Sequence, residues 1–201
     1  MGEAAQHDVV DSGLEDFAQS VADQVQNFLM AVRAIASSGD APRAVPLLLL
    51  EVSQLLLAGA RLGAHVDFVP AETYETDVGP DPDLDAVRES LAGLLDSIDL
   101  YHEVFDPYAP SPEVLSARVS DDVSAIAGSV AHGLAHHRAG RIDEALWWWQ
   151  FSYVSSWGAE ASGVLRALQS VVSHDRLDSD AAHTQEIERI AAADEITVPP
   201  V

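Results

Sequence analysis

Two histidines four residues apart are the first candidates for chemistry in this sequence. His132 and His136 lie on one face of a predicted helix, and Asp121 lies on the same stripe. Two imidazoles and a carboxylate in that pattern are able to bind a transition metal inside a helical bundle. Such bundle sites usually carry a Glu-x-x-His motif on each of two helices, and the sequence has none. The stripe also faces away from the apolar residues of its helix, so we expect solvated histidines, with a metal site as the alternative.

A second cluster of ionisable and aromatic residues lies where a helix is predicted to end. Its members are Tyr101, His102, Glu103, Asp106 and Tyr108, and the proline at 107 stops the helix. The helix macrodipole would favour the charged form of a histidine at this position. A packed helix terminus is the simpler interpretation of the cluster, and a functional site is the alternative.

Three consecutive tryptophans, residues 147–149, are the most unusual feature of the chain. Successive residues of a helix are about 100° apart, so three indoles cannot share one face. A helical wheel places Trp149 in the core, Trp147 at its edge, and Trp148 on the other side. The neighbours of Trp148 on that side are Glu144, Phe151 and Ser155. We expect Trp148 and Phe151 either to pack under helix one or the C-terminal helix, or to form an exposed patch that binds a partner or a second copy.

The composition restricts the classes of partner. Ten basic residues, all of them arginine, stand against 33 acidic ones, which gives a net charge of -23. A field of this sign repels nucleic acid and anionic membranes, so we expect neither as a partner, whereas a protein partner or self-association is possible. Cysteine is absent, which excludes disulfides and thiolate chemistry. The sequence has no phosphate-binding glycine loop, nucleophile elbow or dinucleotide motif, so we predict no cofactor and no catalytic residue.

The apolar periodicity is helical almost throughout, and no segment shows a convincing strand alternation. Five main helices are predicted, over residues 14–37, 44–63, 83–104, 120–138 and 142–173. The second is apolar nearly all round, so we expect it at the centre of the fold. The fifth should kink near Ser155, Ser156 and Gly158. Gln150 falls on the core face of this helix, so its amide must find hydrogen-bond partners.

The predicted fold is therefore all-α: one bundle of about five main helices with a C-terminal helix. The spacing of Gly133, Gly140 and Trp149 resembles a tetratricopeptide helical hairpin, of which only one unit is visible. We expect residues 1–13 to be disordered or frayed, 14–178 to form the bundle, and 179–201 to form an acidic tail with a possible short helix. The N-terminus has no apolar signal region, and the most apolar run, 46–62, is short for a membrane span. We therefore expect a cytoplasmic protein.

Two motifs resemble an uncharacterised, mostly actinobacterial protein family. They are Glu144-Ala-Leu-Trp-Trp-Trp-Gln-Phe-Ser-Tyr153 and Tyr101-His-Glu-Val-Phe-Asp-Pro-Tyr108. The resemblance extends over residues 16–178 and implies an all-helical cytoplasmic bacterial protein. It brings no activity, substrate or cofactor, so no catalytic residue is transferred from it.

Three functions remain open at this point. The first is a noncatalytic protein-interaction module, able to dimerise, that uses the surface around Trp148 and Phe151. The second is a metal-dependent helical-bundle enzyme that uses the histidines and nearby carboxylates. The third is an acidic decoy that binds basic, nucleic-acid-binding proteins.

Overall fold

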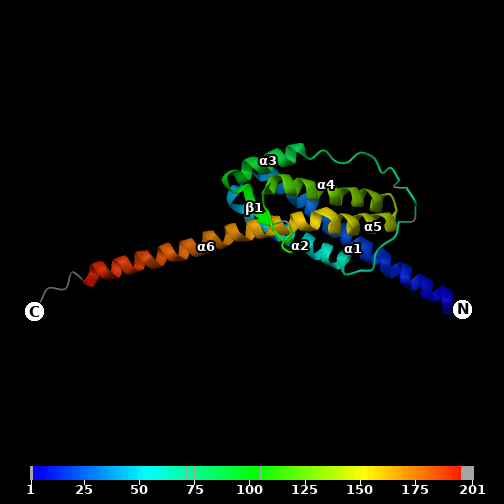
Figure 1. Ribbon diagram of the computed structural model, residues 1–201, viewed down its shortest axis with the longest axis horizontal. Helices are drawn as coiled ribbons and strands as arrows, with labels where there is room; N and C mark the ends of the chain where they lie inside the picture. Colours follow the sequence, from blue (N-terminus) through cyan, green and yellow to red (C-terminus); the bar gives the residue numbers. More distant parts are fainter. Residues whose placement is uncertain (1, 71, 75, 105, 196–201) are drawn as a thin grey trace, which may run out of the picture.

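The protein is a helical bundle with one small β-hairpin (Figure 1). The computed structural model describes the backbone of residues 2–70, 72–74, 76–104 and 106–195, and side chains within residues 13–178 of these ranges. The helices are α1 (Gly2–Ser38), α2 (Ala41–Gly63), α3 (Asp85–Leu95), α4 (Val119–Arg138), α5 (Ile142–Ser152) and α6 (Gly158–Glu195). Strands β1 (Leu100–Val104) and β2 (Val114–Arg118) pair in antiparallel fashion between α3 and α4. The predicted all-α class is confirmed.

The two ends of the chain extend beyond the bundle on opposite sides (Figure 1). Helix α1 begins at Gly2 rather than near Leu14, and α6 continues to Glu195 as a single helix. The predictions for residue 1 and for residues 196–201 lie outside the described residues. The division into a bundle of 14–178 and a tail of 179–201 remains a prediction.

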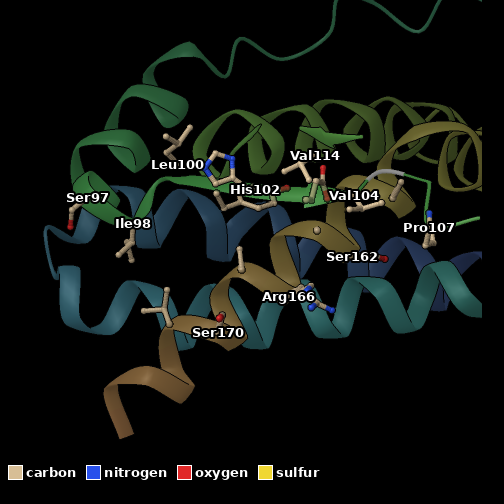
Figure 2. A pocket seen from close by; sticks show the side chains of 16 residues that line it. Ser97, Ile98, Leu100, His102, Val104, Pro107, Val114, Ser162, Arg166 and Ser170 are labelled. Atoms are coloured by element: carbon tan, nitrogen blue, oxygen red, sulfur yellow. The ribbon is translucent and has the colours of Figure 1, made fainter. Parts of the chain in front are cut away.

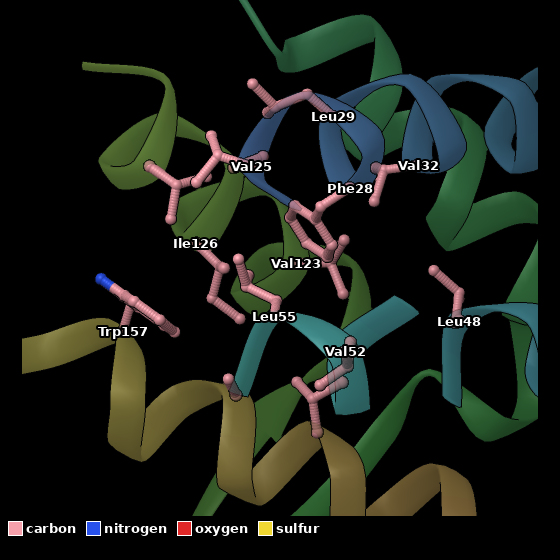
Figure 3. Packing of buried hydrophobic residues seen from close by; sticks show 14 of the residues in the cluster. Val25, Phe28, Leu29, Val32, Leu48, Val52, Leu55, Val123, Ile126 and Trp157 are labelled. Carbon is pink, nitrogen blue, oxygen red and sulfur yellow. The ribbon is translucent and has the colours of Figure 1, made fainter. Parts of the chain in front are cut away.

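The core forms where α1, α2, α4 and α6 meet. Its largest fully buried side chains include Trp149, Trp157, Phe28 and Leu55. Figure 3 shows Phe28 of α1 facing Val52 and Leu55 of α2, with Val123 and Ile126 of α4 beside them. The apolar residues that recur at three- and four-residue spacing along α4 are all buried, namely Val123, Ile126, Val130 and Leu134. Periodicity therefore identified the inward face of this helix correctly.

Helix α2 is less buried than its composition suggests. One face, with Leu48, Val52 and Leu55, is fully buried, whereas Leu50 and Leu57 on the other face are 50% and 65% exposed. Helix α2 contacts α1, α3, α5 and α6 as a central helix would, but these neighbours cover only one of its sides. Among the described helices, α2 is long and apolar enough to cross a membrane by length and composition alone, a test that core helices of soluble proteins also pass.

Helices α5 and α6 form one rod with an irregular turn at its centre. The turn is a π-helix over Tyr153–Trp157, and regular α-helix resumes at Gly158. A β-carbon at Gly158 would overlap the carbonyl oxygen of Tyr153, so the tighter backbone packing requires glycine. The kink predicted around Ser155, Ser156 and Gly158 falls at this π-turn, which is a recognised cause of helix bending.

The segment predicted to complete the third helix folds differently. Helix α3 ends at Leu95, Asp96 takes a left-handed φ of 39°, and a 3-10 turn over Asp96–Ile98 leads into β1. Asp99 explains this departure. Its carboxylate is 1% exposed and accepts hydrogen bonds from the backbone N–H and hydroxyl of Ser120, at 2.8 and 2.9 Å. It also pairs with the Arg118 guanidinium at 3.2 Å. Because it accepts from the Ser120 N–H in the first turn of α4, Asp99 caps this helix from 21 residues away in the sequence.

Helices α4 and α5 form the predicted helical hairpin, with a glycine where they cross. A β-carbon at Gly133 would overlap the indole of Trp149, whereas one at Gly128 on the same helix would lie 3.9 Å from the nearest atom, in Leu84.

We predict that Gly133→Ala lowers the free energy of unfolding by about 1–3 kcal/mol through overpacking. Gly128→Ala should leave it unchanged or raise it by up to about 1 kcal/mol. Urea denaturation measures the free energy of unfolding of both variants. Equal changes would contradict the close approach of the Trp149 indole to Gly133.

The cap at Asp99 gives a second prediction. Asp99→Asn should lower the free energy of unfolding by about 1–3 kcal/mol, because the buried donors of Ser120 lose a charged acceptor. The matched control is Asp96→Asn, a change of charge at nearly constant shape in an exposed position, with an expected change below about 0.5 kcal/mol. Thermal unfolding followed by circular dichroism measures both. If Asp99→Asn lowers the free energy of unfolding no more than the control does, the Asp99 carboxylate does not stabilise the contact between β1, β2 and the start of α4.

Candidate functional site

The paired histidines pack into the fold rather than into solvent. The ring centroids of His132 and His136 lie 5.1 Å apart, and His136 is only 1% exposed. His132 stacks 4.3 Å from the Trp148 ring, and its Nδ1 lies 2.7 Å from Asp81 Oδ1. The expectation of solvated histidines is therefore wrong for His136. Helix α4 contacts α1, α3, α5 and α6, so the side away from its main apolar stripe is also covered.

The third proposed metal ligand does not join them. Asp121 lies eleven residues before His132 on α4, about 16 Å along the helix axis. Its carboxylate pairs instead with the Arg88 guanidinium at 3.5 Å. Within the described part of the chain, no three histidine or carboxylate side chains converge as metal ligands would. The sequence pattern placed these residues on one stripe correctly but said nothing about their separation along it.

The tryptophans divide as the helical wheel predicts, with one difference. Trp149 is fully buried, and its indole N–H donates to the carbonyl of Val130 at 3.0 Å. Trp148 is half-buried, and its N–H donates to the preceding carbonyl on α4, that of Ser129, at 2.8 Å. Consecutive indoles thus bind consecutive carbonyls of α4. Trp148 packs on α4, whereas we expected helix one or the C-terminal helix.

The remaining members of the predicted interaction surface are only partly together. Phe151 is 52% exposed and stacks on Trp147, with ring centroids 5.4 Å apart. Ser155 is exposed, and its hydroxyl donates to the Phe151 carbonyl. Glu144, however, is only 6% exposed. The exposed part of this surface is therefore small and is centred on Phe151.

Gln150 confirms the expectation that its amide needs partners. It is 7% exposed, and its Nε2 donates to the Leu62 carbonyl at 2.9 Å and to those of His65 and Val66 at 3.3 Å. Its Oε1 accepts from the Phe68 N–H at 2.9 Å. One side chain therefore holds the C-terminal end of α2 and the loop that follows it against α5.

The cluster predicted at a helix end lies mostly on strand β1. Tyr101 and Glu103 point inward and His102 outward, where its Nδ1 is 3.1 Å from the Ser116 hydroxyl of β2. Asp106 and Tyr108 lie in the turn, with Tyr108 94% exposed. No helix ends at His102, so the macrodipole argument for its charge does not hold. The inward pair, by contrast, belongs to a larger group.

Two carboxylates that sequence reasoning missed complete this group. The Tyr101 hydroxyl donates to Asp122 of α4 at 2.7 Å, and Glu103 lies against Gly163 of α6, where any β-carbon would overlap its carboxylate. Burial raises the pKa of Glu103 and of Glu160, and the charge of Asp122 raises both further. Burial also raises the pKa of Asp122, partly offset by the hydrogen bond from Tyr101. The carboxylates of Glu103 on β1, Asp122 on α4 and Glu160 on α6 are thus crowded together on the inner side of the strand.

A groove of about 880 Å³ runs between β1 and α6 beside this group (Figure 2). All five residues of β1 line it, and the α6 wall includes Ser162, Gly163, Arg166 and Ser170. Strand β2 contributes only Val114. Because successive side chains of a strand point to opposite faces, five consecutive residues line one groove only if it follows the edge of the strand. The groove therefore runs along the edge of β1 away from β2.

The carboxylate group makes stability depend on pH. A folded-state pKa above the ordinary value of 4.5 means that stability is fully present below that pH and is lost as pH rises through the folded pKa. We predict that Glu160→Gln removes part of this loss, so that it stabilises the protein near neutral pH by on the order of 1 kcal/mol or less, since solvent screens a partly exposed group. Glu113→Gln, at an exposed position, is the control. Urea denaturation from about pH 4 to about pH 8 checks the difference. Parallel curves for the two variants would contradict the prediction.

Comparison with known proteins supports the fold and identifies the family. No curated protein matches the sequence. A crystal structure, that of protein BF1032 from Bacteroides fragilis, is similar in fold, with 20% sequence identity, a TM-score of 0.57, and coverage of 75% of this chain and 89% of that one. Residues 12–174 match the family model DUF5063, a domain of unknown function. The chain therefore belongs to the DUF5063 family.

Proposed function

We propose that this protein is a noncatalytic protein-interaction module that binds an extended, basic segment of a partner protein in the groove between β1 and α6. The observation that carries the proposal is that all five residues of β1 line the groove.

The edge of β1 offers a template for one more strand. The hairpin has two strands, so among the described residues one edge of β1 has no partner strand. Such an edge presents a row of N–H and C=O groups that pair readily with another chain. Residues 100–104 contain no proline, so every position retains its N–H. A segment added here would gain main-chain hydrogen bonds from β1 and side-chain contacts from α6, which is the strand-addition mode of peptide recognition.

Charge favours a basic segment as the occupant. Glu103 lines the groove, and Asp122 and Glu160 lie behind it. The charge of Asp122 raises the pKa of both glutamates, and the charge of Glu103 also raises that of Glu160. Arg166 is the one basic side chain in the groove walls. A guanidinium or ammonium group beside Glu103 would relieve the repulsion among the carboxylates, and the net charge of -23 would attract it from a distance.

The alternatives have less support from the geometry. The metal-enzyme hypothesis needs His132, His136 and Asp121 to converge. Asp121 lies at the other end of α4, where it pairs with Arg88 of α3. Around Trp148 and Phe151, the exposed side chains are Phe151, Val154 and Ser155, and Trp148 itself packs on α4. The acidic-decoy hypothesis shares the preference for basic partners but needs no groove, so it predicts binding by charge alone.

The test is a peptide-display selection against the full chain, followed by affinity measurements on variants. Ser162 is exposed on α6 and lines the groove, so Ser162→Trp fills it at little cost to the fold. Gln169→Trp, exposed on the same helix outside the groove, is the matched control. We expect enriched peptides that alternate basic and aliphatic residues and that bind Ser162→Trp at least about tenfold more weakly. Binding to Gln169→Trp should be unchanged.

A proline substitution within an enriched peptide separates strand addition from simple charge attraction. Proline removes a backbone donor but leaves the peptide charge intact, so strand addition predicts weaker binding. Equal binding of the parent and proline peptides would favour the acidic decoy. If every peptide binds both tryptophan variants equally well, the groove is not the binding site.

A further inference from the structure

A second hollow lies beside the groove, beyond the start of β1. This hollow, of about 340 Å³, shares Ile98 and Val171 with the groove, so the two adjoin each other at these residues. Its other walls are the first turns of α2, from Ala41 to Pro46, and the part of α6 around Val172. Figure 2 shows Ile98 at the end of the groove near Ser170, while Val104 and Pro107 lie at the other end near Ser162. A segment lying along β1 would therefore meet the hollow beyond Leu100.

We propose that the second hollow holds an aliphatic side chain of the bound segment, an anchor located beyond the residues that pair with β1. This inference rests on the proposed function, because it concerns the same bound segment. Part of the wall of the hollow consists of apolar side chains that are partly or fully buried, namely Val45, Ile98, Val171 and Val172. Such a surface gains free energy when a hydrocarbon side chain displaces water from it.

The charge pattern separates the anchor from the basic part of the segment. The ionisable residues that line the hollow are Asp175 and Arg176, adjacent on α6, exposed, and opposite in sign. Their fields nearly cancel, unlike the field of the three carboxylates of Glu103, Asp122 and Glu160. The segment is therefore basic where it passes Glu103 and uncharged and aliphatic where it reaches the hollow. At about 3.3 Å per residue, five paired residues and a short extension require a segment of roughly eight or nine residues.

The experiment uses synthetic peptides of about nine residues in which arginine and valine alternate along the strand portion. The peptides end in leucine or in alanine, and each is also made in reversed order, so the result does not depend on strand direction. Ala41→Trp fills the hollow from an exposed position in the first turn of α2, and Ala60→Trp, exposed on the same helix outside it, is the control. Isothermal titration calorimetry measures each affinity on the full chain.

In the wild type and in Ala60→Trp, the leucine peptide should bind roughly tenfold more tightly than the alanine peptide in one of the two orders. In Ala41→Trp this preference should vanish, with the affinity for the alanine peptide unchanged. Equal affinities for leucine and alanine in both orders would overturn the anchor while leaving the groove intact, as would a leucine preference that survives Ala41→Trp. Failure of every peptide to bind would overturn both the anchor and the proposed function.

Discussion

The buried carboxylate of Asp99 holds the corner at which β1, one wall of the groove, begins. It binds the backbone N–H and hydroxyl of Ser120 and the guanidinium of Arg118, while its own carbonyl accepts from the Val119 N–H at 2.9 Å. These bonds join the start of β1 to the end of β2 and the first turn of α4. Burying a carboxylate is costly unless its oxygens are fully hydrogen-bonded, so the arrangement tolerates little movement. The direction of β1 along α6 follows from this corner.

The remaining walls depend on close helix packing. Trp148 and Trp149 bind neighbouring carbonyls of α4, and Gly133 lets the Trp149 indole approach the backbone of that helix. The π-turn over Tyr153–Trp157 joins α5 to α6, and Gly163 of α6 leaves room for Glu103 of β1. Two of the three consecutive tryptophans thus contribute to the site indirectly, because they hold α5, which leads into α6, against α4.

The sequence was informative where the determining contacts are local. Periodicity identified the buried stripe of α4, the core position of Trp149, the irregular turn before Gly158 and the need of Gln150 for partners. It failed where a distant residue decides the outcome. Residues 100–104 form a strand because Asp99 bonds to Ser120, 21 positions later, and no local pattern contains that bond. His136 is buried because several helices cover α4, and Asp122 and Glu160 join Tyr101 only through the tertiary fold.

The central claim is that the free edge of β1 receives an added strand. Hydrogen–deuterium exchange of the full chain, with and without a saturating arginine–valine peptide, tests this most directly because it reports on individual backbone amides. The account predicts slower exchange in residues 100–104 and along the groove face of α6, with little change around Phe151. Protection centred on residues 147–155, or none in β1 while the peptide is bound, would contradict it.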